Sequence, residues 1–398
     1  MNIQPYRTPD QHWPPKLTLW WFHLAKFWRL KALRKQKIES IQLEGLEHLE
    51  SSLRSKHGIL MAPNHSFHYD SYCLLEAADR LSTPFYFMSA WQVFHMSSWF
   101  ERMSMQRCGC FSVDREGTDM QAMKTAVDIM QNRPHPLVIF PEGDVYHTND
   151  RVTPFRDGAA AMALMAARKA ERNVVILPVA IKRWYVEDPM PSLQKSLESL
   201  ERRLYWRPTP NKPVLDRIFR IAEGILSLKE LEYLNQSQSG SLPDRIRSLA
   251  DTVLTRAEQR NQVVSKGGIL PERVKEVRRK IIVDQEAAGD KATEEQKRAW
   301  MEDMDDMFLA TQLYSYPGDY LQQDPTIERI AETIDKLEED ALGAIYPSIH
   351  GARKAVVKLD APIVLPQGKE KKWSPSELTD LIESRVQSML DHLNQMPK

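Results

Sequence analysis

Residues 58–76 place a short strand, a polar turn and the start of a helix in direct succession. The apolar run at 59–62 has the length and composition of a buried strand, and Pro63 and Asn64 end it. A helical pattern of apolar residues begins at Tyr72. Because a strand that leads through a turn into a helix is the repeating unit of parallel sheets, this stretch predicts an α/β fold.

The same alternation continues along the chain. We expect further strands at 84–89, 109–113, 137–140 and 174–181, and helices at 91–103, from Thr118 or Asp119 to Met130, and at 158–170. Strands that alternate with helices predict a mainly parallel sheet flanked by helices.

A histidine and a carboxylate flank the first predicted turn, at His65 and Asp70. Residues five positions apart point to different faces of a continuous helix, so these side chains meet only if the chain turns between them. If they meet, the carboxylate accepts from one ring nitrogen and leaves the other as a base, as in a hydrolase triad without its serine. The nucleophile would then be a substrate hydroxyl. The simpler alternative is that Asp70 caps the helix and His65, like His68, is an ordinary loop histidine.

Three further motifs follow, each beside a predicted strand. They are Gly109-Cys-Phe111-Ser-Val-Asp-Arg115, then Phe140-Pro-Glu142-Gly143 with Pro-Phe-Arg-Asp-Gly at 154–158 behind it, and Ile176-Leu-Pro178-Val. Together with Asn64-His65-x-x-x-x-Asp70, they resemble in order and separation the four motifs of the glycerolipid acyltransferases, the lysophosphatidate acyltransferase family. The aromatic residue of the second motif, Phe111, stands one position early.

This resemblance implies the glycerolipid acyltransferase fold and transfer of a fatty acyl group from acyl-CoA or acyl-carrier protein to a lysophospholipid hydroxyl. An acceptor similar to 1-acyl-glycerol-3-phosphate, and a role in phospholipid biosynthesis or remodelling, follow from it. His65 would be the general base and Asp70 the residue that orients it, with no further cofactor. The other motif positions would bind substrate: Asn64, Gly109, Arg115, Glu142, Gly143 and Pro178. Among them Arg115 suits a phosphate, whereas Glu142 would bond glycerol hydroxyls or orient Arg115.

One departure concerns the acceptor. The phosphatidate-forming branch continues Glu-Gly-Thr with an arginine close behind, whereas this chain has Asp144 and its next arginine at Arg151. A carboxylate near an expected phosphate weakens the case for lysophosphatidate itself and leaves other lysophospholipids open. Two alternatives keep the same fold, namely a non-catalytic lipid-binding or scaffold protein and a lipid hydrolase or transacylase. The Met- and Trp-rich stretch 91–103 has two interpretations, the lining of an acyl channel and ordinary core.

Residues 1–37 combine a tryptophan-rich helical stripe with many basic residues. The stripe contains Leu17, Trp20, Trp21, Leu24, Phe27 and Trp28, and the basic residues are Lys16, Lys26, Arg29, Lys31, Arg34, Lys35 and Lys37. This pattern is typical of an amphipathic helix that lies on an anionic membrane surface. The alternative is a helix that packs on the protein's own core with solvated lysines.

After Trp184 the strand pattern stops. Residues 185–351 show helical periodicity and polar linkers, and a strand pattern returns at 354–359, followed by a last helix from Ser374 or Ser376. We therefore expect residues 38–184 and 352–398 to form the acyltransferase domain and 185–351 to be a helical insertion. The competing arrangement is a separate C-terminal domain.

Composition narrows the class of protein further. The chain has 398 residues, and its 54 basic and 54 acidic residues leave no charge excess that would indicate nucleic acid. Three cysteines provide neither a disulfide framework nor a paired metal site, so no metal is expected. No apolar stretch reaches the length of a membrane span, and the polar residues 1–11 argue against a secretory signal. The sequence therefore predicts a cytoplasmic protein that associates peripherally with a membrane.

Overall fold

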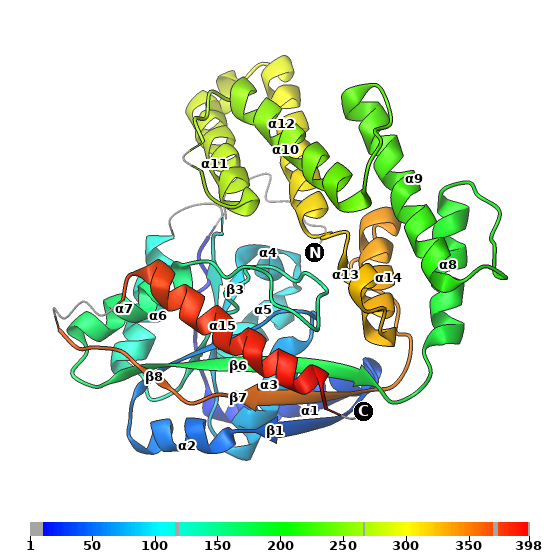
Figure 1. Ribbon diagram of the computed structural model, residues 1–398. Helices are drawn as coiled ribbons and strands as arrows, with labels where there is room; N and C mark the ends of the chain where they lie inside the picture. The colour runs from blue at the N-terminus through cyan, green and yellow to red at the C-terminus, as the bar shows by residue number, and fades with distance from the viewer. Residues whose placement is uncertain (1–10, 116–118, 266, 369–372, 397–398) are drawn as a thin grey trace.

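The computed structural model describes residues 11–115, 119–265, 267–368 and 373–396. Within these residues, one eight-stranded sheet runs in the order β1-β7-β6-β2-β5-β3-β4, with β8 paired to β6 (Figure 1). The strands are β1 (Ile38–Glu44), β2 (Gly58–Pro63), β3 (Tyr86–Ala90), β4 (Cys110–Val113), β5 (Leu137–Val138), β6 (Val174–Tyr185), β7 (Arg353–Leu359) and β8 (Ile363–Val364).

Most neighbouring strands are parallel. Strand β2 runs parallel to β5 and β6, β3 runs parallel to β4 and β5, and only β7 and β8 run antiparallel to β6. The predicted α/β class with a mainly parallel sheet is therefore confirmed. The carboxyl ends of β2, β4 and β5 lie at one edge of the sheet, and polar side chains that follow these strands can meet there.

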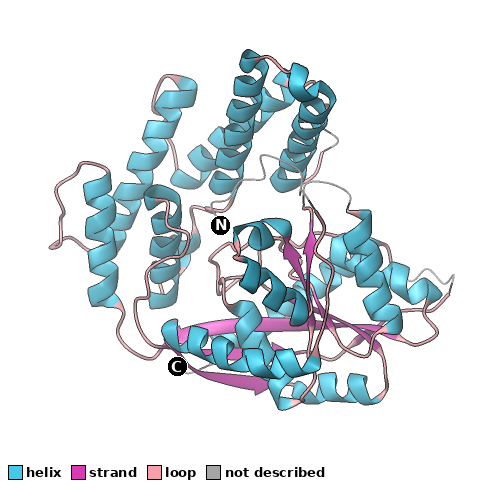
Figure 2. Cartoon of the chain, turned by 180° about the vertical axis from the view of Figure 1, so that it is seen from behind, coloured by secondary structure: helices cyan, strands magenta, loops and turns pink. Residues whose placement is uncertain are grey.

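Helices cover both faces of the sheet, and alternation along β2 explains the two cores. Leu60 and Ala62 pack against α6 (Met120–Asn132), α7 (Gly158–Lys169) and α15 (Pro375–Asn394). Ile59 and Met61 point to the other face and pack against α1 (Leu19–Lys35), α2 (Leu46–Arg54) and α3 (Asp70–Arg80). The result is a three-layer α/β/α arrangement, seen from both sides in Figures 1 and 2.

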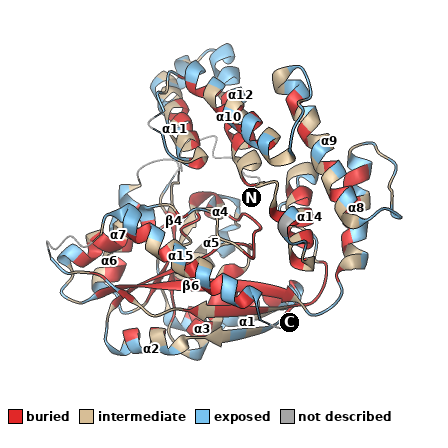
Figure 3. Cartoon of the chain, viewed as in Figure 1, coloured by how far each residue is buried: buried red, intermediate tan, exposed pale blue. Residues whose placement is uncertain are grey.

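A long helical segment separates β6 from β7. It contains α8 (Met190–Arg203), α9 (Val214–Leu234), α10 (Leu242–Arg260), α11 (Leu270–Ala288), the short helix η1 (Gly289–Lys291), α12 (Glu294–Tyr314), α13 (Tyr320–Gln323) and α14 (Ile327–Leu342). The chain then returns to the sheet, where β7 pairs with both β1 and β6. Figure 3 shows buried residues concentrated in the sheet, whereas the outer faces of α10, α11 and α12 are exposed. We refer to 185–351 as the insertion, since both of its ends join strands of one sheet.

Local signals explain several helix boundaries. The stretch 91–103 forms two helices rather than one, α4 (Trp91–Met96) and α5 (Trp99–Arg107), because Ser98 starts a new helix with a capping box to Glu101. Asp119 caps α6 by accepting from two backbone N–H groups, and Thr118 lies outside the described residues. Ser374 caps α15 in the same way as Ser98, through a reciprocal contact with Glu377.

Candidate active site

The turn after β2 brings His65 and Asp70 together. His65 Nδ1 lies 3.1 Å from Asp70 Oδ2, and the imidazole ring stacks on Phe140 at a centroid distance of 4.1 Å. The histidine side chain is 19% exposed, whereas that of Asp70 is fully buried. Within the described part of the chain, Nε2 makes no hydrogen bond. This is the geometry in which a carboxylate holds an imidazole and leaves its outer nitrogen as an acid or base.

Asp70 also folds the turn itself. Its Oδ2 accepts hydrogen bonds from the backbone N–H groups of Ser66 and Phe67, both at 2.8 Å. The residue is the first of α3, where a carboxylate interacts favourably with the helix dipole. Asp70 therefore does both things that the sequence left as alternatives, because it organises the start of the helix and contacts His65.

Two buried arginines support the turn from behind. The guanidinium groups of Arg183 and Arg353 lie over the ring of Phe67 at 4.0 and 4.7 Å. Arg183 also donates to Ser66 through its Nη2, at 3.3 Å to both the backbone oxygen and Oγ. Arg183 comes from β6 and Arg353 from β7. The strand that returns after the insertion therefore helps to hold residues 64–69, which we call the histidine turn. The sequence motifs contain neither arginine.

Glu142 connects the third motif to the first. Its Oε1 accepts from the backbone N–H of His65 at 2.6 Å, and its Oε2 accepts from the backbone N–H of Thr153 at 3.2 Å. Burial raises the pKa of Glu142 to about 8, although these two backbone donors act in the opposite direction. Because the carboxylate is 2% exposed and bonded on both oxygens, we correct its expected contact with glycerol hydroxyls to a positioning role at His65.

Asn64 has a similar positioning role. Its side chain donates to the carbonyl of Ile181 at 3.0 Å and accepts from the N–H of the same residue at 2.7 Å. These bonds tie the end of β2 to β6. Since the side chain is fully buried, we correct the expected substrate contact of Asn64 to a structural one.

Arg115 and Gly143 meet at the carboxyl edge of the sheet, a contact that the motifs did not specify. Arg115 Nη1 donates to the Gly143 carbonyl at 2.6 Å and lies 3.3 Å from Asp144. Gly143 has φ of 79°, and a Cβ there would lie 2.8 Å from the guanidinium carbon of Arg156. Two guanidinium groups and one carboxylate thus surround the Gly143 turn, a setting in which an anionic group can bind close to His65.

Gly109 and Pro178 do not join this site. Gly109 precedes β4, at the edge opposite the carboxyl ends, and its φ of 92° and a Cβ position 2.8 Å from the Phe85 carbonyl require glycine. Pro178 lies within β6 beside Ala62, and its carbonyl accepts a hydrogen bond from the backbone N–H of Asp360. We therefore correct both from substrate-binding to structural positions.

A cluster that the sequence did not indicate lies next to the turn. His68 Nε2 and His147 Nε2 lie 2.7 and 3.2 Å from Glu339 Oε1. These contacts join helix α14 of the insertion to the histidine turn. Although burial opposes it, contact with the two imidazoles holds the pKa of Glu339 below its usual range. Two nitrogens and one oxygen can also ligate a divalent ion such as zinc. The members are far apart in sequence, so ligand spacing could not have found them.

Comparisons with known proteins agree with this geometry. Residues 40–182 match the protein family described as Acyltransferase. A 1-acyl-sn-glycerol-3-phosphate acyltransferase of Streptococcus pneumoniae is 30% identical over 123 residues, which cover 30% of this chain and 40% of that relative. The match contains the motif residues that the fold gathers at the carboxyl edge of the sheet. Residues 40–182 are thus similar to acyltransferases, and the part aligned with the Streptococcus pneumoniae enzyme spans less than half of either protein.

Proposed function

We propose that this protein transfers a fatty acyl group from a thioester to the hydroxyl of a lysophospholipid. The observation that carries the proposal is the contact of His65 with the buried carboxylate of Asp70, at the carboxyl edge of a mainly parallel sheet. The similarity to a 1-acyl-sn-glycerol-3-phosphate acyltransferase supports the same chemistry. The donor would be acyl-CoA or acyl-carrier protein, and no other cofactor is needed.

The proposed reaction uses the two ring nitrogens of His65 in different ways. His65 Nε2 accepts the proton of the acceptor hydroxyl as its oxygen attacks the thioester carbonyl, while Asp70 stabilises the imidazolium through Nδ1. The tetrahedral intermediate then collapses, the carbon–sulfur bond breaks, and the thiolate leaves with the proton from His65. The products are an ester and a free thiol. General-base help of this kind accelerates a reaction by about 10²- to 10⁴-fold.

In this proposal the acceptor's head group binds at the Gly143 turn. Arg115 and Arg156 flank this turn, and Asp144 neutralises part of their charge. A phosphate bound there would compete with Asp144 for Arg115. We therefore propose a lysophospholipid with one phosphate, similar to 1-acyl-glycerol-3-phosphate, whose charge is partly balanced at this turn.

An apolar surface next to α3 supports peripheral membrane binding. Helix α1 packs Trp21 and Phe22 inward and exposes Trp20, Leu24, Phe27 and Trp28, and α5 exposes Trp99 and Phe100 beside them. We call these six exposed residues the aromatic patch. Exposed basic residues surround it on α1: Lys26, Lys31, Arg34 and Lys35. Within the described residues, no helix is long and apolar enough to cross a bilayer. We propose that the protein works in the cytoplasm, with the aromatic patch on a membrane surface.

Flotation with lipid vesicles tests the membrane proposal. Burying an aromatic side chain in lipid stabilises binding by about 1.5–3 kcal/mol, so the pair Trp20→Ser and Phe27→Ser should weaken binding at least about tenfold. Leu228→Ser, at a residue 59% exposed on α9, should bind normally. If the native protein, the double variant and Leu228→Ser bind vesicles equally, the aromatic patch is not the membrane-binding surface.

The function itself is tested by thiol release from acyl-CoA and acyl-carrier protein with a panel of lysophospholipids. We expect release that depends on an acceptor and is lost in His65→Ala, and unchanged release in His392→Ala, a change at an exposed histidine of α15. Release without any acceptor would favour a hydrolase. No release with any donor or acceptor would favour a non-catalytic lipid-binding protein.

A further inference from the structure

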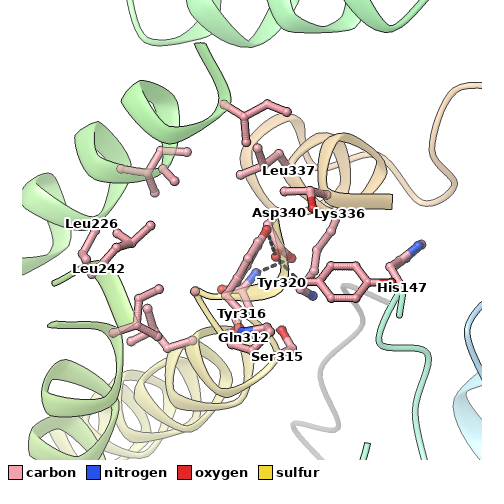
Figure 4. A pocket seen from close by; sticks show the side chains of 18 of the residues that line it. His147, Leu226, Leu242, Gln312, Ser315, Tyr316, Tyr320, Lys336, Leu337 and Asp340 are labelled. Atoms are coloured by element: carbon pink, nitrogen blue, oxygen red, sulfur yellow. Dashed lines mark hydrogen bonds and ion pairs between the residues drawn. The ribbon is translucent and has the colours of Figure 1, made fainter. Parts of the chain in front are cut away.

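The helices of the insertion line a partly open, mostly apolar cavity of about 190 Å³. Its walls come from α9, α10, α12, α13 and α14, and one side is closed by residues 146–148 of the acyltransferase domain (Figure 4). Apolar side chains from all five helices line it, among them Ile218, Leu242, Leu313, Leu321 and Leu337. The stretch 91–103, for which the sequence left an acyl channel open, does not contribute to this wall.

The polar side chains at the cavity largely bond to one another. Asp340 accepts from Gln312 at 2.9 Å and from the Tyr316 hydroxyl at 2.7 Å, and Lys336 lies 3.5 Å from the same carboxylate (Figure 4). The hydroxyl of Tyr320 donates to a buried glutamate of α14. An apolar cavity of about 150 Å³ in another protein stays dry and binds small hydrocarbons. This cavity is larger and partly open, and its apolar lining suits an apolar occupant.

The cavity adjoins the histidine turn. Tyr146, which lines it, donates its backbone N–H to the His65 carbonyl at 3.4 Å. Two residues later, Thr148 Oγ1 is buried at the cavity wall and makes no hydrogen bond within the described residues. The wall bonded to the turn thus offers an unsatisfied hydroxyl, while the helices beyond it offer hydrocarbon. An occupant with a polar head near His65 and an apolar tail matches this polarity.

We propose that the cavity receives the fatty acyl chain of the thioester donor. This inference rests on the proposed function. The lysophospholipid acceptor can keep its own chain in the bilayer while its head group enters the site. The donor is a water-soluble thioester, and its chain needs an enclosed apolar space once it leaves the carrier. The insertion then determines which chain lengths are transferred.

Substitutions at the wall test the proposal through the donor chain-length profile. Ala222→Phe narrows the cavity and Phe219→Ala widens it, since both residues line it. Each excluded methylene weakens binding about fourfold, so Ala222→Phe should lower kcat/KM for hexadecanoyl-CoA by about tenfold or more relative to octanoyl-CoA. Phe219→Ala should shift the profile toward longer chains. Ala299→Phe, exposed on α12 outside the cavity, should keep the native profile.

Two results would overturn the proposal. One is a native donor profile in both wall variants, and the other is a shift in the preferred chain length of the lysophospholipid rather than of the donor. If circular dichroism shows that Ala222→Phe does not fold, Phe219→Ala alone decides between the outcomes.

A binding measurement separates this inference from the proposed function. The fluorescent fatty acid cis-parinaric acid should bind native protein and His65→Ala equally and should bind Ala222→Phe at least tenfold more weakly. If it does so while no acceptor supports transfer, the proposed function fails and the cavity assignment stands. Transfer that depends on His65, with native chain-length and probe binding in Ala222→Phe, would leave the function intact and reject the cavity assignment.

Discussion

The histidine turn and the insertion use buried charge in different ways. At the turn, Asp70 is fully buried and bonded, but its partner His65 keeps one nitrogen toward solvent. Inside the insertion, Arg217 and Glu201 are equally buried, and Glu201 accepts from the guanidinium at 3.1 and 2.8 Å. The first arrangement leaves an imidazole nitrogen able to react, whereas the second is a buried ion pair whose two members bond to each other. Substitutions at these two charged pairs should therefore change activity at the turn and stability in the insertion.

The largest effect on stability is expected within the insertion. Arg217→Met leaves Glu201 buried without its cation and should lower the free energy of unfolding by about 3–5 kcal/mol. In protein that remains folded, kcat should change less than about threefold. Urea denaturation followed by circular dichroism measures the first quantity. Arg247→Met, at an exposed pair with Asp244, is the control and should cost at most about 1 kcal/mol. A large loss of kcat in folded Arg217→Met would contradict the difference between the two regions, because it would show that this buried pair also affects catalysis.

A smaller effect is expected where the two regions meet. Glu339→Gln removes the charge that faces His68 and His147, and hydrogen bonds to charged groups stabilise a fold by about 1.5–3 kcal/mol. Because His68 lies in the histidine turn and His147 beside it, kcat should fall together with stability. Asp335→Asn, one turn earlier on α14 and paired with His350, is the matched control and should lower stability alone. Equal kcat in the two variants would show that the Glu339 contact does not influence the turn.

Counted per pH unit, the smallest expected effect is a pH dependence of stability. Burial and nearby Asp150 raise the pKa of Glu332 to about 8, so the folded protein holds a proton that the unfolded chain has released above pH 4.5. Stability should therefore fall as the pH rises from about 5 to 8, by at most about 1.4 kcal/mol per pH unit for this group. Glu332→Gln should flatten this slope, whereas Glu302→Gln, at an exposed glutamate of α12, should not. Identical slopes in native protein and Glu332→Gln would exclude Glu332 as the source.

Local patterns predicted much of the sheet and the centre of the candidate site. His65, Arg115 and Gly143 each come a few residues after the end of a strand. Parallel strands bring their carboxyl ends to one edge of the sheet, so these residues were expected there. The sequence did not reveal that Asn64 and Glu142 bond to the protein's own backbone. A motif gives the spacing of residues but does not show which side chains point into the fold. The position of Gly109 was predicted wrongly for a similar reason. Its motif, 109–115, includes the whole of strand β4, so Gly109 and Arg115 lie at opposite edges of the sheet.

Contacts between distant segments could not be predicted. Arg353 reaches Phe67 only because β7 returns to the sheet after the insertion, and Glu339 meets His68 only because α14 packs on the turn. Helical periodicity predicts that 185–351 is helical, but it does not tell which helices leave a cavity between them. The cavity depends on how side chains of several helices fill the space, a property of tertiary packing.

The central claim is that His65 and Asp70 act as one unit, and a double-mutant cycle on kcat/KM for thioester transfer tests it most directly. Asp70→Asn keeps the shape of the residue, and His65→Ala removes the imidazole. If Asp70 acts through His65, the double variant should be no slower than His65→Ala, within about threefold, because the effects of residues that act together do not multiply. Losses that multiply in the double variant would contradict the account and assign Asp70 a structural role alone.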